Sequence, residues 1–131
     1  MELDCKEILI NNDSQIGDIQ NEFSTAYPFL KIDFLVKGNG TKNGRTIVLD
    51  SHTSLQQLGK VNPRKIDINR HRSVSEVSND FEEMLGVIVQ VSRKSGRVWN
   101  TISVSDSWTL QSQNIAGEYI SSEMALNRIK Q

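Results

Sequence analysis

A short run of polar residues has the chemistry to bind an anion: Arg70, His71, Arg72 and Ser73. The run directly precedes a predicted helix, because Ser73 and Glu76 have the spacing of a capping box. Cations at a helix N-terminus oppose the helix dipole, which favours negative charge there by about 0.3–1 kcal/mol. The run therefore gains a rationale if an anion docks on exposed amides between the arginines. The alternative is a solvated loop whose arginines pair with acidic residues such as Asp67 or Asp80.

Basic residues also gather around two predicted hairpin turns. The second turn is flanked by Arg93, Lys94 and Arg97, and the first by Lys37, Lys42 and Arg45. If the two turns lie side by side, they form paired basic fingers near Trp99 and Trp108, where cations hold phosphates and an aromatic ring stacks on a base. Trp99 is the candidate aromatic contact. The alternative is ordinary solubilising charge at hairpin tips, which also discourages pairing between sheet edges.

Residues for catalysis or metal binding do not form a recognisable motif. His52 and His71 are the two histidines and Cys5 is the one cysteine, so the usual zinc ligand sets cannot be assembled. The glycines at 38, 40 and 44 lie in a hairpin connection, which matches neither a P-loop nor a dinucleotide-binding fingerprint. No Gly-x-Ser-x-Gly elbow is present. We expect no catalytic residue, no metal site and no cofactor.

Composition restricts the class of protein further. A chain of 131 residues with 37% hydrophobic residues suits one domain, spanning 1–131. Its 15 basic and 16 acidic residues nearly cancel, which argues against nucleic acid as a partner without excluding it. The single cysteine, the lack of a recognisable signal peptide and the short apolar runs predict a cytoplasmic protein with no membrane association.

An internal repeat is the main signal for the fold. Residues 10–23 align with residues 68–81 without a gap, 58 residues apart, and identical pairs include Ile10/Ile68 and Phe23/Phe81. Composition alone gives roughly one identity over such a length. We therefore expect a duplicated structural unit, with an internal repeat over 6–58 and 64–114.

Each unit has the pattern strand, helix, strand, strand. In the first unit these elements are expected near 8–10, 16–27, 30–34 and 46–49, and in the second near 66–68, 74–85, 87–91 and 98–102. The prediction is an α+β fold with about six strands, in which each strand–helix–strand segment makes a right-handed parallel crossover and the helices lie mainly on one face, giving two layers. The pattern leaves open whether the strands form one sheet or two.

Short helices are expected after each hairpin. Thr53 or Ser54 can cap one around 55–58, and Ser107 can cap one around 108–110. The last segment, 115–131, is predicted to be helical, with Tyr119, Leu126 and Ile129 on one stripe, and to cover the face of the sheet away from the other helices. Gly117 argues for a break between this helix and the preceding turn.

The run from Asp106 to Asn114, with Trp108-Thr109-Leu110 and Gln113-Asn114, follows the hairpin Arg93-Lys94-Ser95-Gly96-x-x-Trp99. This run resembles the ending of a group of small bacterial proteins with no assigned function, and the resemblance covers mainly residues 73–114. It implies no activity. From its type alone, Trp108 is expected to anchor the final helix on the sheet, with a partner-binding aromatic as the alternative.

These observations favour a non-enzymatic binding or assembly module. Unpaired sheet edges make a homodimer plausible, since such edges need pairing or protection. One alternative is anion or nucleic-acid binding through the basic helix N-terminus and the hairpin tips. The other is an enzyme with a cleft between the repeats, for which the arginines at 70–72 and the turn at 93–97 must converge on one deep pocket.

Overall fold

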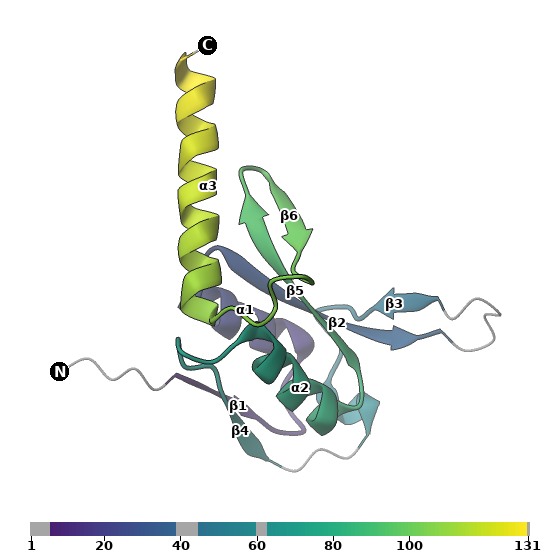
Figure 1. Ribbon diagram of the computed structural model, residues 1–131. Coiled ribbons are helices and arrows are strands. Elements are labelled where there is room, and N and C mark those ends of the chain that lie inside the picture. The colour runs from purple at the N-terminus through teal and green to yellow at the C-terminus, as the bar shows by residue number, and fades with distance from the viewer. Residues whose placement is uncertain (1–5, 39–44, 60–62, 131) are drawn as a thin grey trace.

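The computed structural model describes residues 6–38, 45–59 and 63–130 (Figure 1). The described elements, in chain order, are β1 (Glu7–Ile10), α1 (Ile16–Ala26), β2 (Leu30–Lys37), β3 (Thr46–Val48), the 3-10 helix η1 (Leu55–Leu58), β4 (Arg64–Asp67), α2 (Val74–Leu85), β5 (Ile88–Ser95), β6 (Val98–Thr101) and α3 (Leu110–Lys130). The strands and the first two helices lie close to their predicted places.

The strands form two separate sheets. β1 and β4 make a two-stranded ribbon, and the other four strands lie in the order β3-β2-β5-β6. Every pairing within these two sheets is antiparallel. The expected α+β class with about six strands is confirmed. The expected parallel crossover is wrong, because β1 and β2 lie in different sheets and pair with strands from the other half of the chain. A single two-layer arrangement is not confirmed.

Residues from both halves share one hydrophobic core. The predicted helix stripes are buried as expected; their buried members are Ile16, Ile19 and Phe23 in α1 and Val74, Val77, Phe81 and Leu85 in α2. Phe34 of β2 meets Phe81 of α2 edge to face, with ring centroids 5.4 Å apart. Because β2 belongs to the first half and α2 to the second, neither half encloses its apolar side chains alone.

The N-terminus of α1 is held by the chain that returns after the first hairpin. The Ile16 N–H donates to the Thr53 carbonyl oxygen at 2.9 Å, and the Gly17 N–H donates to the Ser51 carbonyl oxygen at 2.8 Å. In return, the Leu55 N–H donates to the backbone oxygen of Ser14 at 2.9 Å. The first-turn amides of a helix have no partner inside the helix, so these bonds satisfy groups that otherwise need water or a ligand.

The N-terminus of α2 is held in the corresponding way. The Val74 N–H donates to the Trp108 carbonyl oxygen at 3.1 Å, and the Ser75 N–H donates to that of Asp106 at 2.9 Å. The Leu110 N–H donates to the backbone oxygen of Arg72 at 2.8 Å. We call these two matched sets of hydrogen bonds the helix-start clasps. They fix where η1 and α3 begin.

α3 is one continuous helix, so the expected break at Gly117 is wrong. It starts at Leu110, and Thr109 caps it by accepting the Ser112 N–H at 3.1 Å, whereas Ser107 was the expected cap. A methyl group on Gly117 would lie 2.8 Å from the Phe29 Cβ atom and 3.1 Å from the Arg93 Cγ atom. Glycine is needed at this point of α3 because another chain segment approaches the helix closely.

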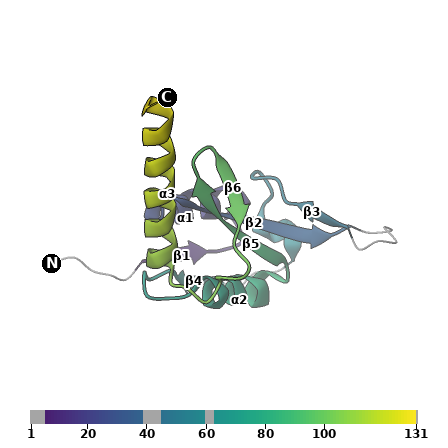
Figure 2. The same cartoon turned by 45° about the horizontal axis from the view of Figure 1, so that its top comes forward.

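α3 does not cover the sheet face that lies away from α1 and α2. It packs against β5 near Arg93, which is on the same side of that strand as the core residue Val91. In both views, the C-terminal part of α3 extends beyond the rest of the protein (Figures 1 and 2). No helix among the described residues is long and apolar enough to cross a membrane.

Replacing Gly117 with alanine is expected to destabilise the protein by about 1–3 kcal/mol, although alanine is the better helix former. The added methyl group must displace the backbone and Cβ atom of Phe29. Chemical denaturation measures the change in free energy of unfolding. Glu118→Ala, an exposed change on the next residue of α3, is the control and should stay within about 0.5 kcal/mol of the wild type. Equal stability of the Gly117→Ala variant and the wild type would contradict the close packing.

Tyr27 provides a pH-dependent link between the halves. Its buried hydroxyl donates to the Ile68 carbonyl oxygen at 2.5 Å. Burial, with a smaller contribution from the negative charge of Asp67, raises the pKa of Tyr27 to about 12 from its ordinary value of 10.0. The folded protein therefore holds this proton more tightly than the unfolded chain, and the stability that Tyr27 contributes is full below about pH 10 and is lost as the pH rises to about 12.

Tyr27→Phe is expected to lower stability at neutral pH by about 1–2 kcal/mol and to flatten the alkaline loss of stability. Denaturation midpoints measured from pH 8 to pH 12 test both effects. Tyr119→Phe removes the hydroxyl of an exposed tyrosine and should follow the wild-type curve. An unchanged alkaline limb in Tyr27→Phe would be evidence against the coupling.

Candidate functional site

The amides at the start of α2 all have partners within the protein. Besides the two clasp bonds, the Glu76 N–H donates to the Ser73 hydroxyl at 3.1 Å, and the Ser73 N–H donates to the Glu76 carboxylate at 2.8 Å. The predicted capping box is confirmed. These hydrogen bonds from Ser73 lower the pKa of Glu76. The helix start therefore offers no vacant first-turn amide to an anion.

The two arginines of the predicted anion site have different surroundings. The Arg72 Nη1 atom donates to the Asp80 carboxylate at 2.5 Å and to the Asp67 carbonyl oxygen at 2.9 Å. The hydrogen bond to Asp80 raises the pKa of Arg72. Arg70 and His71 are exposed, and the Arg70 carbonyl oxygen accepts the Gln111 N–H of α3. Arg72 thus ties α2 to the outer edge of β4, and this matches the alternative of arginines paired with acidic residues.

The hairpin cluster does not form paired basic fingers. β2 and β5 run antiparallel, so the turn after each strand lies at the opposite end of the sheet (Figure 1). Arg97 is exposed at the second turn. Lys42 lies outside the described residues. The expectation that the two turns lie side by side is therefore wrong.

Trp99 lies on the sheet face away from the core and is 37% exposed. The Lys31 ammonium lies 5.3 Å from the centre of its ring, and Lys94 is its neighbour across β5 and β6. Such a cation–ring contact contributes about 0.5–1 kcal/mol at exposed sites. Trp99 therefore already has a cation over its ring.

Arg93 belongs to the attachment of α3 and not to the turn. Its Nη1 atom donates to the side-chain oxygen of Gln113 at 2.9 Å, and the Gln113 amide nitrogen donates to the carbonyl oxygen of Ser105 at 2.7 Å. Gln113 is completely buried. The next residue, Asn114, accepts the Phe29 N–H at 2.8 Å. The Gln-Asn pair of the motif after Trp108 thus locks the base of α3 to the body.

The groups that an enzyme cleft requires do not converge. The described cavities lie in three places: about 440 Å³ between β1 and α1, about 290 Å³ beside β2 and the start of β5, and about 200 Å³ around 100–105. Of the basic residues around the hairpin turns, Lys37 lines the second cavity and Arg93 the third, and none of these three cavities is lined by Arg70, His71 or Arg72. Within the described ranges, no group of three or more histidine, cysteine or acidic side chains is placed to hold a metal ion.

The apolar stripe of α3 was expected to pack on the sheet, and the structure leaves it exposed. Tyr119 and Leu126 of the predicted stripe are 66% and 49% exposed, and Ile115, which the prediction omitted from the stripe, is 55% exposed. The side chain of Ile129 lies outside the described part of the structure. The side that docks on the body instead carries Gln113, Gly117 and Ser121, spaced by four residues. The stripe lies on the opposite side of the helix.

Trp108 does not anchor α3 on the sheet, because it precedes the helix and is 49% exposed. Its carbonyl group belongs to the second helix-start clasp, as described above. Leu110, two residues later, is completely buried and takes the anchoring position. The expectation that Trp108 anchors α3 is therefore wrong.

Comparisons with protein-family models, curated proteins and solved structures find no match for this chain. The kinship with the bacterial group and the cytoplasmic location therefore stay predictions. The surfaces described above are the basis for any functional proposal.

Gln113→Ala is expected to destabilise the protein by about 2–4 kcal/mol, because it leaves Arg93 and Ser105 without their partner in a buried site. Thermal and chemical denaturation measure the loss. Gln111→Ala, on the same turn of α3 but outside this network, is the control and should change the free energy of unfolding by less than about 1 kcal/mol. If both variants lose the same small amount, the network does not hold α3.

Proposed function

We propose that this protein is a non-enzymatic assembly module in which two copies associate through α3. The observation that carries the proposal is the exposed stripe of Ile115, Tyr119 and Leu126, on the side of α3 opposite the body. Burial of apolar surface is the main driving force of association. The C-terminal part of α3 extends past the body (Figure 2), and the exposed stripe on this helix is therefore accessible to a second copy.

The spacing of the stripe suits a coiled-coil seam. Ile115, Tyr119, Ser122 and Leu126 follow one another at intervals of four, three and four residues, which is the alternation of a heptad repeat. Three of these four positions are apolar, so we expect a weak and reversible dimer.

Charge selects the orientation of the two helices. In a parallel pair, Glu118 of one copy flanks Glu123 of the other, and like charges repel. In an antiparallel pair in which Ile115 meets Leu126 and Tyr119 meets Ser122, Glu118 lies beside Ala125 and Glu123 lies beside Ala116. An antiparallel pair about a twofold axis therefore avoids the repulsion and gives each copy the same contacts.

Duplication of one unit accounts for the place where α3 begins, because the same arrangement precedes η1 in the first unit and α3 in the second. The alignment of 10–23 with 68–81 and the matched helix-start clasps support two copies of a strand–helix–strand–strand unit. After the first unit, the chain forms the short helix η1, which ends before Gly59, where φ is 133°. After the second, the same starting point leads into α3. The long helix is what distinguishes the second unit, and we place the assembly surface there.

The two alternative functions have less support. Anion binding requires vacant amides at the start of α2, and those amides are occupied. Nucleic-acid binding by paired hairpins requires tips on the same side of the sheet, and the tips point apart. An enzyme cleft requires the arginines of 70–72 and 93–97 to line one pocket, and none of the three described cavities is lined by both groups.

Analytical ultracentrifugation over a wide concentration range tests the proposal. The wild type should show a concentration-dependent dimer, and Tyr119→Glu should weaken dimerisation about tenfold or more, because it places a charge in the seam. Asn127→Glu adds the same charge to α3 outside the stripe and serves as the matched control. A wild type that stays monomeric into the millimolar range, or a dimer that Tyr119→Glu leaves intact, would rule out association through α3.

Disulfide trapping tests the orientation in a Cys5→Ser background. An antiparallel pair should cross-link a mixture of Ile115→Cys and Leu126→Cys proteins. Neither variant should cross-link efficiently alone, because two copies of residue 126 are then about 16 Å apart along the axis. Cross-linking of each variant with itself would instead indicate a parallel pair.

A further inference from the structure

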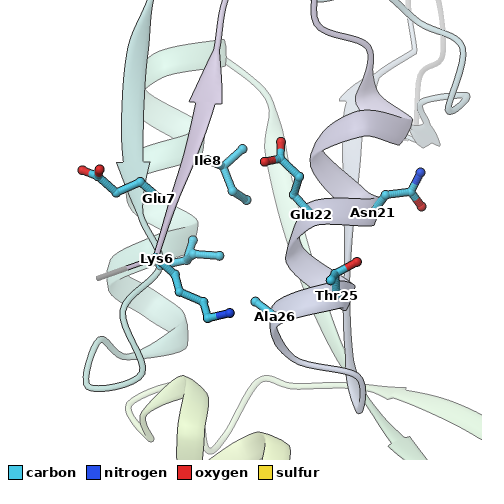
Figure 3. A pocket seen from close by; sticks show the side chains of 8 residues that line it. Lys6, Glu7, Ile8, Asn21, Glu22, Thr25 and Ala26 are labelled. Carbon is cyan, nitrogen blue, oxygen red and sulfur yellow. The ribbon is translucent and has the colours of Figure 1, made fainter. Parts of the chain in front are cut away.

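The largest described cavity is a groove between the free edge of β1 and the helix α1 (Figure 3). Its volume is about 440 Å³, and it is lined by Lys6, Glu7, Ile8, Asn21, Glu22, Thr25, Ala26 and Ile68. We call it the β1–α1 groove. One wall is a strand edge and the other is the polar side of a helix.

The other half of the protein has the same pair of walls, formed by β4 and α2, and a guanidinium group bridges them there. Arg72 reaches from the loop before α2 and binds the Asp80 carboxylate at 2.5 Å and the Asp67 carbonyl oxygen at 2.9 Å. The Ile68 N–H donates to the Lys6 carbonyl oxygen on the inner side of the ribbon, so the adjacent Asp67 carbonyl lies on its outer edge. Arg72 therefore joins a carboxylate of α2 to a carbonyl group of β4 that takes no part in the pairing of β4 with β1.

The β1–α1 groove retains a helix carboxylate, Glu22, beside a strand edge, and it has Lys6 but no arginine among its lining residues. At the 58-residue spacing of the repeat, Asp80 corresponds to Glu22 and Asp67 corresponds to Leu9, whereas Arg72 corresponds to Ser14. The Ser14 hydroxyl is engaged locally, accepting the Asn11 N–H at 3.2 Å. No ion pair joins Glu22 to another residue in the part of the chain that the structure describes.

We propose that the β1–α1 groove binds a guanidinium group from another molecule, which bridges β1 and α1 as the Arg72 side chain bridges β4 and α2. Glu22 accepts two N–H groups of the planar fork, a geometry that carboxylate and guanidinium share. The Thr25 hydroxyl and the outer carbonyl oxygens of β1 belong to the same walls and accept the remaining donors. The positive charge of Lys6 does not prevent a guanidinium group from binding, because the other half has Arg64 at the corresponding position and Arg72 is bound there.

The guanidinium group has two possible sources. It can belong to a free arginine-like compound, or to an arginine residue in an extended segment of another protein. In the second case, the segment lies along the free edge of β1 and adds backbone hydrogen bonds to it. Two probes separate these sources: N-acetyl-argininamide, and a short unstructured peptide with a central arginine.

NMR titration of the ¹⁵N-labelled full chain tests the proposal. Both probes should shift the amide resonances of Glu7, Leu9, Asn21, Glu22 and Thr25, and N-acetyl-lysinamide should bind several-fold more weakly. Glu22→Gln should weaken binding about tenfold, whereas Glu118→Gln on α3 should leave it unchanged. The dispersion of the same spectra reports whether each variant is folded. Tighter binding of the peptide indicates a protein partner, and equal affinities indicate recognition of the side chain alone.

Ser14→Arg is a second and independent variant. It places an arginine where the other half of the protein has Arg72, so it should occupy the groove from within and abolish binding of the added probe. Ser14→Lys, with the same charge but no planar fork, should block binding less completely. Absence of shifts at the groove with both arginine probes, or binding that survives both Glu22→Gln and Ser14→Arg, would overturn the proposal.

Discussion

The first-turn amides of α1 and α2 must be satisfied, and the way this is done determines the path of the rest of the chain. In each half the segment that follows the hairpin returns across the helix start and gives it two backbone carbonyl oxygens. The loop before the helix gives a carbonyl in return to the element that follows, η1 or α3. In the second half, the segment 106–110 and the start of α2 are therefore joined by hydrogen bonds in both directions, which fixes the start of α3 relative to α2.

This reciprocal bonding explains why the loop at 70–73 is structural. Its carbonyl groups point toward the start of α3, and the Arg72 side chain links α2 to the edge of β4. Two arginines before a helix suggested an anion, and the sequence alone did not decide between an anion and acidic side chains such as Asp67 or Asp80 as the group that compensates their charge. The compensating carboxylate is Asp80, on the next turns of the same helix, together with a strand edge that only the tertiary structure brings near.

The differences between the halves carry the two proposals. The second half has Arg72 across its groove and a long helix after its clasp, and the first half has Ser14 and the short η1. α3 is anchored at its start by the buried Leu110, and farther along it is attached by small and polar groups, namely Gly117, Ser121 and the buried Gln113. Ile115, Tyr119 and Leu126 are left exposed on the outer side. A helix attached in this way leaves its apolar stripe on the surface, where the proposed dimer forms.

The sequence by itself determined the local elements, since the spacing of apolar residues and the capping box depend on neighbours only a few positions apart. It also indicated an apolar stripe on the last helix. Only the tertiary structure decided that β1 pairs with β4 and not beside β2, that Gly117 continues a helix where Phe29 approaches, and which side of α3 meets the body. These features depend on contacts between residues far apart in the chain. The spacing of apolar residues along a helix predicts that an apolar stripe exists, but it does not predict which part of the protein covers that stripe.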